Sequence, residues 1–402
     1  MGEQRHSLLT GLGVDTWPLR LYVMKTIIII NYCFDAYLRT IAMATFATGT
    51  DELKNTDGVN RPGWFVSRRV DILFVFGLGA LLSAVLFAAD GHKGIFLVGA
   101  VAFSLLSDLP HVLTTTARVW MDPRERSRFW AHYVISFTVV AAIVGTLWFG
   151  GWMVPLLAVW AYWQVFHVLK QHFGIINIYA AKNGYKGPRN RLKYALYAVC
   201  LAPVLYRASQ GLNFSEYVVF GHRLPFSNLS VPVPPIPGFL VIGGFVCAAV
   251  MLGIAVWEQV QLKRAGQRTL PAMSVATFVI AALSYNLSYL LVSDLFALIL
   301  IATTTHSLQY HLINWTRNNT RFARTEDPGE KKLLLARLST RKALPLYIAF
   351  FGGLGILAGQ LDTVIFAVPL TFVLHHFYMD GALWKSKGNP ELAHDLGIVR
   401  AG

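Results

Sequence analysis

The chain has 402 residues, of which 55% are hydrophobic and only 14% are charged, and its formal net charge is +14. Soluble domains carry roughly 25% charged residues, so this composition excludes an ordinary soluble domain and indicates a polytopic membrane protein. An excess of Lys and Arg in the loops on one side of a membrane explains the positive charge without a nucleic-acid partner.

The first 61 residues are predicted to form a separate N-terminal segment. Within it, residues 17–47 are apolar but interrupted by Lys25, Asp35 and Arg39. Charges at these positions favour an amphipathic helix that lies in the membrane interface over a helix that spans the bilayer. We therefore expect an N-terminal segment with an interfacial helix (1–61), a single transmembrane domain (62–384) and a cytoplasmic tail (385–402).

Hydropathy predicts that the transmembrane domain is all-α, with about ten spans. Each apolar segment is close to the roughly 20 residues that cross a hydrocarbon core of about 30 Å. Short or polar connectors separate the spans, except for a proline-rich loop at 208–236 that we expect to form an ordered cap or an extended segment on the external side. The ten predicted spans are 71–89, 95–117, 130–150, 152–178, 192–207, 237–257, 271–291, 293–315, 343–360 and 362–383.

The charges of the loops predict the orientation. When the ten spans alternate in direction, the loops rich in Lys and Arg all fall on one side of the membrane, and the opposite loops hold few cations. Because such loops are typically cytoplasmic, we expect both termini to be cytoplasmic and the protein to lie in the inner (cytoplasmic) membrane.

Seven histidines lie on four predicted spans, each in the half of the span nearer the cytoplasm. Ionisable residues inside hydrocarbon are costly and tend to mark function, and imidazole is a common ligand of iron, copper and zinc. Seven independent helix contacts would be expected to use both leaflets. We therefore predict a metal site toward the cytoplasmic leaflet, with enough ligands for two iron ions, formed by His111, His167, His172, His306, His311, His375 and His376.

Three further residues are candidates for the same site. Asp108 precedes His111 by three residues and Asp380 follows His376 by four, so each carboxylate lies on about the same helical face as its histidine. Each could be a metal ligand or could accept a hydrogen bond that orients an imidazole, and the alternative is that it neutralises a nearby basic side chain. The third candidate is His132, near the cytoplasmic start of the third span.

Two of the histidine pairs share a five-residue spacing, in FHVLKQHFG (166–174) and THSLQYHLI (305–313). At 3.6 residues per turn, positions i and i+5 point roughly 140° apart, so one regular helix cannot aim both side chains at one ion. Three arrangements are open: a π-bulge aligns the pair, each pair spans two adjacent ions, or one histidine binds and the other supports it.

The histidine segments resemble those of two enzyme families. HVLKQH, HSLQYH and LHHFYMD resemble the histidine boxes of membrane fatty-acid desaturases and hydroxylases, which are di-iron enzymes. DLPHVLTT, FHVLKQHFG and THSLQYH resemble, in the same order, the histidine segments of Brp/Blh-type β-carotene-cleaving dioxygenases. The second resemblance implies an iron site at Pro110-His111, with His111, His172, His306 and His311 as ligands.

Both resemblances imply non-haem iron and O2 chemistry on a lipophilic substrate. We predict a membrane oxidoreductase that hydroxylates, desaturates or cleaves such a substrate and receives electrons from an unidentified donor. One alternative is a proton- or metal-coupled transporter, which would carry ionisable groups through both leaflets. Another is a haem-binding electron-transfer protein, which would use two facing histidines. A zinc hydrolase of the HExxH type is disfavoured because the motif is missing.

Overall fold

The computed structural model describes residues 63–398, apart from 90–91, 220–221, 225, 360–366 and 386–388. These residues belong to one compact unit, Val59–Gly402, and the other unit, Met1–Gly58, lies outside the described residues together with the predicted interfacial helix at 17–47. The predicted tail 385–402 belongs to the same unit as the residues before it, and the predicted division of the chain into three parts stays a prediction.

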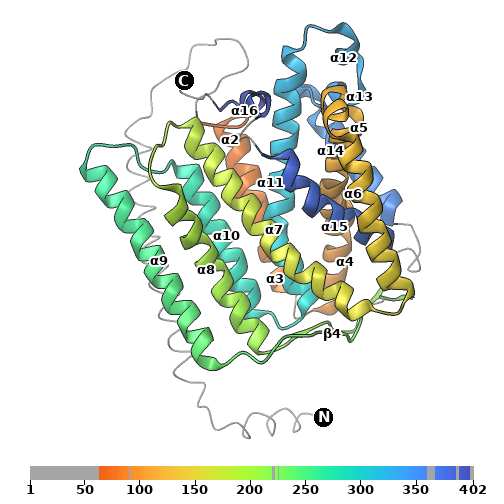
Figure 1. Ribbon diagram of the computed structural model, residues 1–402, viewed down its shortest axis with the longest axis vertical. Coiled ribbons are helices and arrows are strands. Elements are labelled where there is room, and N and C mark those ends of the chain that lie inside the picture. Colours follow the sequence, from red (N-terminus) through yellow and green to blue (C-terminus); the bar gives the residue numbers. More distant parts are fainter. Residues whose placement is uncertain are drawn as a thin grey trace, which may run out of the picture. The chain divides into compact units, whose positions relative to one another are not determined.

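The described chain is mostly helical, which confirms the all-α prediction (Figure 1). All ten predicted spans correspond to helices, and in two of them a π-helical segment joins two α-helices. The elements are α2 (Arg68–Asp71), π-helix (Ile72–Gly77), α3 (Leu78–Ala89), α4 (Lys93–Phe103), π-helix (Ser104–Asp108), α5 (Leu109–Met121), α6 (Pro123–Phe149), α7 (Met153–Lys182), α8 (Arg189–Ser209), α9 (Gly238–Arg264), α10 (Ala272–Leu291), α11 (Leu295–Arg324), α12 (Pro328–Lys332), α13 (Leu334–Leu338), 3-10 helix (Arg341–Ala343), α14 (Leu344–Gly359), α15 (Ala367–Leu383) and α16 (Pro390–Asp395).

Long apolar helices in the described chain are consistent with a membrane protein. Their outward faces carry large apolar side chains, such as Val98, Ile135 and Phe239, which suit contact with lipid. The total of ten spans and the side on which the termini lie stay predictions. By length and composition, five helical segments of the described residues could cross a bilayer: Arg68–Ala89, Gly94–Met121, Pro123–Phe149, Gly238–Arg264 and Ala272–Leu291.

Helix α11 occupies the centre of the packing. It contacts α3, α5, α7 and α10, and nearly all of its side chains are buried (Figure 1). A helix surrounded by other helices can carry polar side chains because its neighbours provide the hydrogen-bonding groups that lipid lacks. This position explains why α11 holds three consecutive threonines and two histidines and still runs through the interior.

Helices α3 and α11 approach each other closely at Gly79. A Cβ atom added to Gly79 would lie 2.8 Å from Cγ2 and 2.9 Å from Cα of Thr305, the residue before His306. Small residues at such crossings let two helix backbones come together. Gly79 therefore holds α3 against the part of α11 that carries His306.

Replacement of Gly79 with Ala is expected to lower the free energy of unfolding by about 1–3 kcal/mol, because the added methyl group overpacks the contact with Thr305. Gly145→Ala in α6 is the matched control, since a Cβ there meets nothing within 4 Å. That control should be neutral or stabilising by up to about 1 kcal/mol. Thermal unfolding in detergent measures both variants, and equal midpoints would contradict the close approach.

The loop at 208–236 forms an ordered cap, one of the two arrangements predicted. Strands β1 (Leu212–Asn213) and β4 (Ser230–Val231) pair antiparallel, as do β2 (Val218–Val219) and β3 (His222–Arg223). Asp294, at the N-terminus of α11, ties the cap to the helices: its Oδ1 accepts hydrogen bonds from the Tyr217 hydroxyl at 2.6 Å and the Ala297 amide at 2.8 Å. The cap thus closes the end of the helices where α11 begins (Figure 1).

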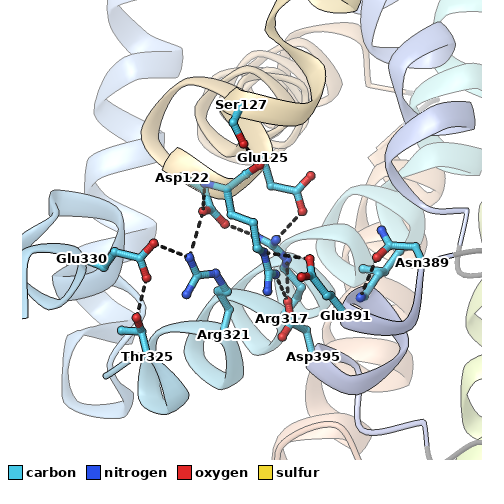
Figure 2. Close-up of polar contacts among 12 residues, drawn as sticks. Asp122, Glu125, Ser127, Arg317, Arg321, Thr325, Glu330, Asn389, Glu391 and Asp395 are labelled. Atoms are coloured by element: carbon cyan, nitrogen blue, oxygen red, sulfur yellow. Dashed lines mark hydrogen bonds and ion pairs between the residues drawn. The ribbon is translucent and has the colours of Figure 1, made fainter. Parts of the chain in front are cut away.

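The C-terminal end of α11 holds a buried group of charged residues that also fixes α16 in place (Figure 2). The guanidinium of Arg317 pairs with Asp122 and Glu125 at the start of α6 and with Asp395 on α16. Leu392 and Leu396 pack into the core beside these pairs. The segment that we predicted to be a tail is therefore part of the folded unit. We call the following residues the ion cluster: Asp122, Glu125, Arg317, Arg321 and Asp395.

Candidate metal centre

Four buried histidines from four different helices come together in the interior, and we call them the histidine cluster. Their imidazoles contact one another in a closed circuit, each packed edge to face against two others. The centroid separations around this circuit are 5.1 Å from His111 (α5) to His306 (α11), 4.9 Å on to His167 (α7), 4.9 Å on to His376 (α15) and 4.9 Å back to His111.

The spacing of the histidine cluster suits a shared metal ion. A transition metal lies about 2.0–2.1 Å from an imidazole nitrogen, so imidazoles that share one ion have centroids roughly 5 Å apart. Two overlapping groups offer ligand atoms that all lie within 4.8 Å of one another: His111 with His306 and His376, and His167 with His376 and Asp380. Both groups contain His376.

Several nitrogen atoms of the histidine cluster are buried without a hydrogen-bond partner among the described residues. They are Nδ1 and Nε2 of His111, Nε2 of His167, Nδ1 of His306 and Nε2 of His376. A buried polar atom without a partner costs free energy, and so many at one place call for an explanation. A bound cation would satisfy the lone pairs of all four imidazoles at once.

A hydrogen-bonded network on the opposite side of His376 sets the orientation of its imidazole. Oγ1 of Thr115 lies 2.7 Å from Nδ1 of His376, and the Tyr310 hydroxyl donates to Oδ1 of Asp380 at 2.6 Å. The Thr115 hydroxyl has acceptors of its own, in Asp380 at 3.2 Å and Tyr310 at 2.7 Å. Every donor is satisfied when His376 carries its proton on Nδ1 and donates it to Thr115. The network therefore assigns the free lone pair to Nε2, which has no hydrogen-bond partner among the described residues.

Asp380 has one oxygen in this network and one toward the histidine cluster. Tyr310 and Thr115 bind Oδ1, whereas Oδ2 lies 4.0 Å from Nε2 of His167. A carboxylate oriented in this way can supply Oδ2 as a fifth ligand while its other oxygen is held by neutral donors.

Each five-residue pair places one histidine in the cluster and the other beside it. His172 lies 6.4 Å from His306, and His311 lies 6.5 Å from His111, both measured between ring centroids. Helices α7 and α11 are α-helical throughout, so a π-bulge does not align either pair. Nε2 of His311 lies 3.0 Å from the Ser107 carbonyl, which can only accept a hydrogen bond. Of the three arrangements open from sequence, the α11 pair matches one histidine facing the centre and one held beside it, whereas both ring nitrogens of His172 in the α7 pair lack a hydrogen-bond partner among the described residues.

Asp108 lies beside the centre rather than within either group of candidate ligands. Its Oδ1 accepts a hydrogen bond from the Ser307 hydroxyl at 2.7 Å and lies 3.5 Å from Nδ1 of His111. The π-helical segment Ser104–Asp108 ends at this residue, directly before His111. The carboxylate is therefore placed to orient the His111 imidazole.

Two predicted residues lie away from the histidine cluster. His375 points toward α6, where its Nε2 lies 2.9 Å from Oγ of Ser136 and its ring packs against Tyr133. His132 is exposed and stacks on Tyr378. Adjacent helical residues point about 100° apart, so only one member of the His375-His376 pair can face the centre.

The structure adds residues that sequence reasoning missed. These residues are Thr115 and Tyr310, which contact the centre. Gln171, which the sequence suggested as a partner for backbone groups, donates a hydrogen bond to the His306 carbonyl at 2.9 Å. A signal for them exists in the sequence, because every histidine of the cluster is followed four residues later by a polar side chain on the same helical face. These i,i+4 pairs are His111–Thr115, His167–Gln171, His306–Tyr310 and His376–Asp380.

Comparison of the chain with protein-family models, curated proteins and solved structures found no match.

Proposed function

We propose that this protein is a membrane non-haem iron oxidoreductase that uses O2 to hydroxylate, desaturate or cleave a lipophilic substrate. The observation that carries the proposal is the histidine cluster, with four buried imidazoles at metal-sharing distances and with nitrogens that lack partners among the described residues. A nitrogen-rich ligand set with a carboxylate nearby suits iron, and so does the likeness of the histidine segments to iron oxygenases.

The geometry favours one iron ion, whereas the sequence favoured two. Both candidate ligand groups need His376, and Thr115 occupies its Nδ1 side. Only Nε2 of His376 is free, and one lone pair binds one ion. We therefore propose a single ion held by His111, His167, His306 and His376, with Oδ2 of Asp380 as a fifth ligand.

The surrounding residues of this chain would orient those ligands. Thr115 and Tyr310 hold Asp380 and His376, and Asp108 lies against His111. Such contacts fix which nitrogen of an imidazole faces the metal and raise its basicity. Bound iron would supply O2 binding and activation at a remaining coordination position. The buried position among apolar helices supports a substrate that arrives from the bilayer, with membrane lipids around it.

The haem-binding alternative is not favoured by the packing. Axial histidines must face each other across a flat macrocycle, whereas each imidazole of the cluster packs edge-on against two others. In the histidine cluster, the space that a haem would need between two facing imidazoles is thus occupied by the other two imidazoles. A transporter remains the main alternative of another class, and it differs in needing no tightly held redox metal.

Metal analysis and optical spectroscopy of detergent-purified protein test the proposal. We expect about one iron per chain and no Soret band, because the ligand set serves one non-haem ion. About two irons per chain would contradict the single-ion arrangement but would still agree with a non-haem iron oxidoreductase. A Soret band would overturn the proposal in favour of haem, and the absence of any tightly bound metal would favour the transporter.

A further inference from the structure

We propose that Trp384 and Tyr310 form a relay that carries single electrons from a reduced carrier protein at the surface to the histidine cluster. This inference rests on the proposed redox function, since a non-redox protein would not need it. The carrier belongs to the class of one-electron donors, such as an iron–sulfur or flavin protein. The relay would supply the route for the electrons that the oxidation of a substrate by O2 requires.

Three aromatic contacts connect the centre with the surface. The ring of Tyr310 lies 5.2 Å from His376 and 5.5 Å from His111, between centroids. The ring of Trp384 lies 5.9 Å from Tyr310, and its Nε1 donates a hydrogen bond to the Tyr310 hydroxyl at 3.3 Å. Tyr310 is buried, and Trp384, just beyond the end of α15, keeps part of its surface exposed. The path is therefore continuous from a partly exposed ring to two histidines of the cluster.

These two residue types are suited to electron transfer. Tunnelling between two groups falls steeply with distance, and a buried centre is reached faster in short steps than in one long step. The rings of Tyr and Trp are among the side chains that lose an electron most readily, so they can act as intermediates in stepwise electron transfer. A second route of rings reaches the histidine cluster from Trp163 through Phe377 to His167, but phenylalanine is much harder to oxidise than Tyr or Trp.

The hydrogen bond from Tyr310 to Asp380 makes the electron transfer feasible for a phenol. If iron bound at the histidine cluster is oxidised by O2, Tyr310 would supply an electron to it, and the hydroxyl proton of Tyr310 would move to Oδ1 of Asp380, which accepts its hydrogen bond at 2.6 Å. Trp384 then returns an electron to Tyr310, the proton moves back from Asp380, and the carrier protein reduces Trp384. The net result is that the carrier loses one electron, the centre gains one, and no proton is consumed.

Arg118 influences which ring of the relay holds the oxidised state. Its guanidinium lies 4.5 Å from the centroid of the Trp384 ring. A cation over the ring raises the energy of an oxidised, positively charged Trp384, so the oxidised state is more stable on Tyr310 than on Trp384. Glu125, which accepts a hydrogen bond from Arg118 at 3.1 Å, partly offsets that charge.

Flash photolysis with electron paramagnetic resonance tests the relay in the full-length protein as purified. A photogenerated ruthenium polypyridyl oxidant removes an electron from aromatic rings at the surface. The tyrosyl radical signal that disappears in the variant Tyr310→Phe is assigned to Tyr310. We expect that signal to be lost in Trp384→Phe, which breaks the path, and in Asp380→Asn, which removes the proton acceptor. Trp120→Phe should retain it, because Trp120 is exposed but its ring contacts Tyr133 instead.

A rescue variant separates the relay from a structural role of Trp384. Trp384→Tyr restores a redox-active ring and should regain the Tyr310 signal that Trp384→Phe loses. Survival of the signal in Trp384→Phe would overturn the relay, as would its absence from the unmodified protein or a failure of Trp384→Tyr to restore it. Because Asp380 is also a proposed ligand, the Trp384 variants, which keep every proposed ligand, decide the relay, and the iron content decides the proposed function separately.

Discussion

Replacement of His376 with Ala is expected to abolish metal binding, whereas replacement of its neighbour His375 is expected to leave the metal in place. His376 belongs to both candidate ligand groups, and its Nε2 has no other partner among the described residues. His375 instead lies against Ser136 and Tyr133 on α6. The two variants change adjacent residues of the same type but should differ in metal content, so each variant serves as the control for the other.

Metal content per chain after purification measures this difference. The variant Thr115→Val adds a graded comparison, because it removes the partner of Nδ1 of His376 while keeping all proposed ligands. A change of this kind typically lowers metal affinity by about 10–100-fold. Equal loss of metal from His375→Ala and His376→Ala would show that the histidine cluster is not the binding site.

The sequence predicts the helices and the residue types of the candidate centre, because both depend on local patterns. It does not predict which histidines converge. His167 and His172 are equally polar and five residues apart, and only the rotation of α7 against α11 and α15 brings the first of them into the cluster. That rotation follows from close packing over the whole helix, including contacts such as Gly79 against Thr305.

The bounds of the helices illustrate a second limit of sequence reasoning. Hydropathy predicted spans at 152–178 and 293–315, but α7 continues to Lys182 and α11 continues to Arg324. A hydropathy window detects only the apolar part of a helix, whereas the helix itself ends where its backbone hydrogen bonds end. Arg317 lies in this extension of α11 and contacts Asp395, which is far away in the sequence. No local sequence pattern predicts such a contact.

Replacement of Arg317 with Met is expected to lower the free energy of unfolding by about 3–5 kcal/mol, the cost typical of removing one partner from a buried ion pair. Arg317 is 0% exposed and lies beyond the predicted span 293–315. Burial, followed by the nearby charge of Arg118, lowers the pKa of its guanidinium to about 10, so it stays charged at neutral pH. Its loss would leave the buried Asp122 and Asp395 without their central cation.

The matched control for this loss is Arg191→Met, which breaks a pair between Glu258 and an arginine that is 63% exposed. Exposed pairs contribute about 0–1 kcal/mol, so this variant should unfold nearly as the original protein does. Thermal unfolding followed by tryptophan fluorescence in one detergent compares the two. Adding Asp122→Asn to Arg317→Met should recover part of the lost stability, because it removes a buried carboxylate that has lost its nearer cation and keeps only Arg321 at 3.5 Å. If Arg317→Met and Arg191→Met unfold at the same temperature, the ion cluster does not stabilise the fold in the way that its burial implies.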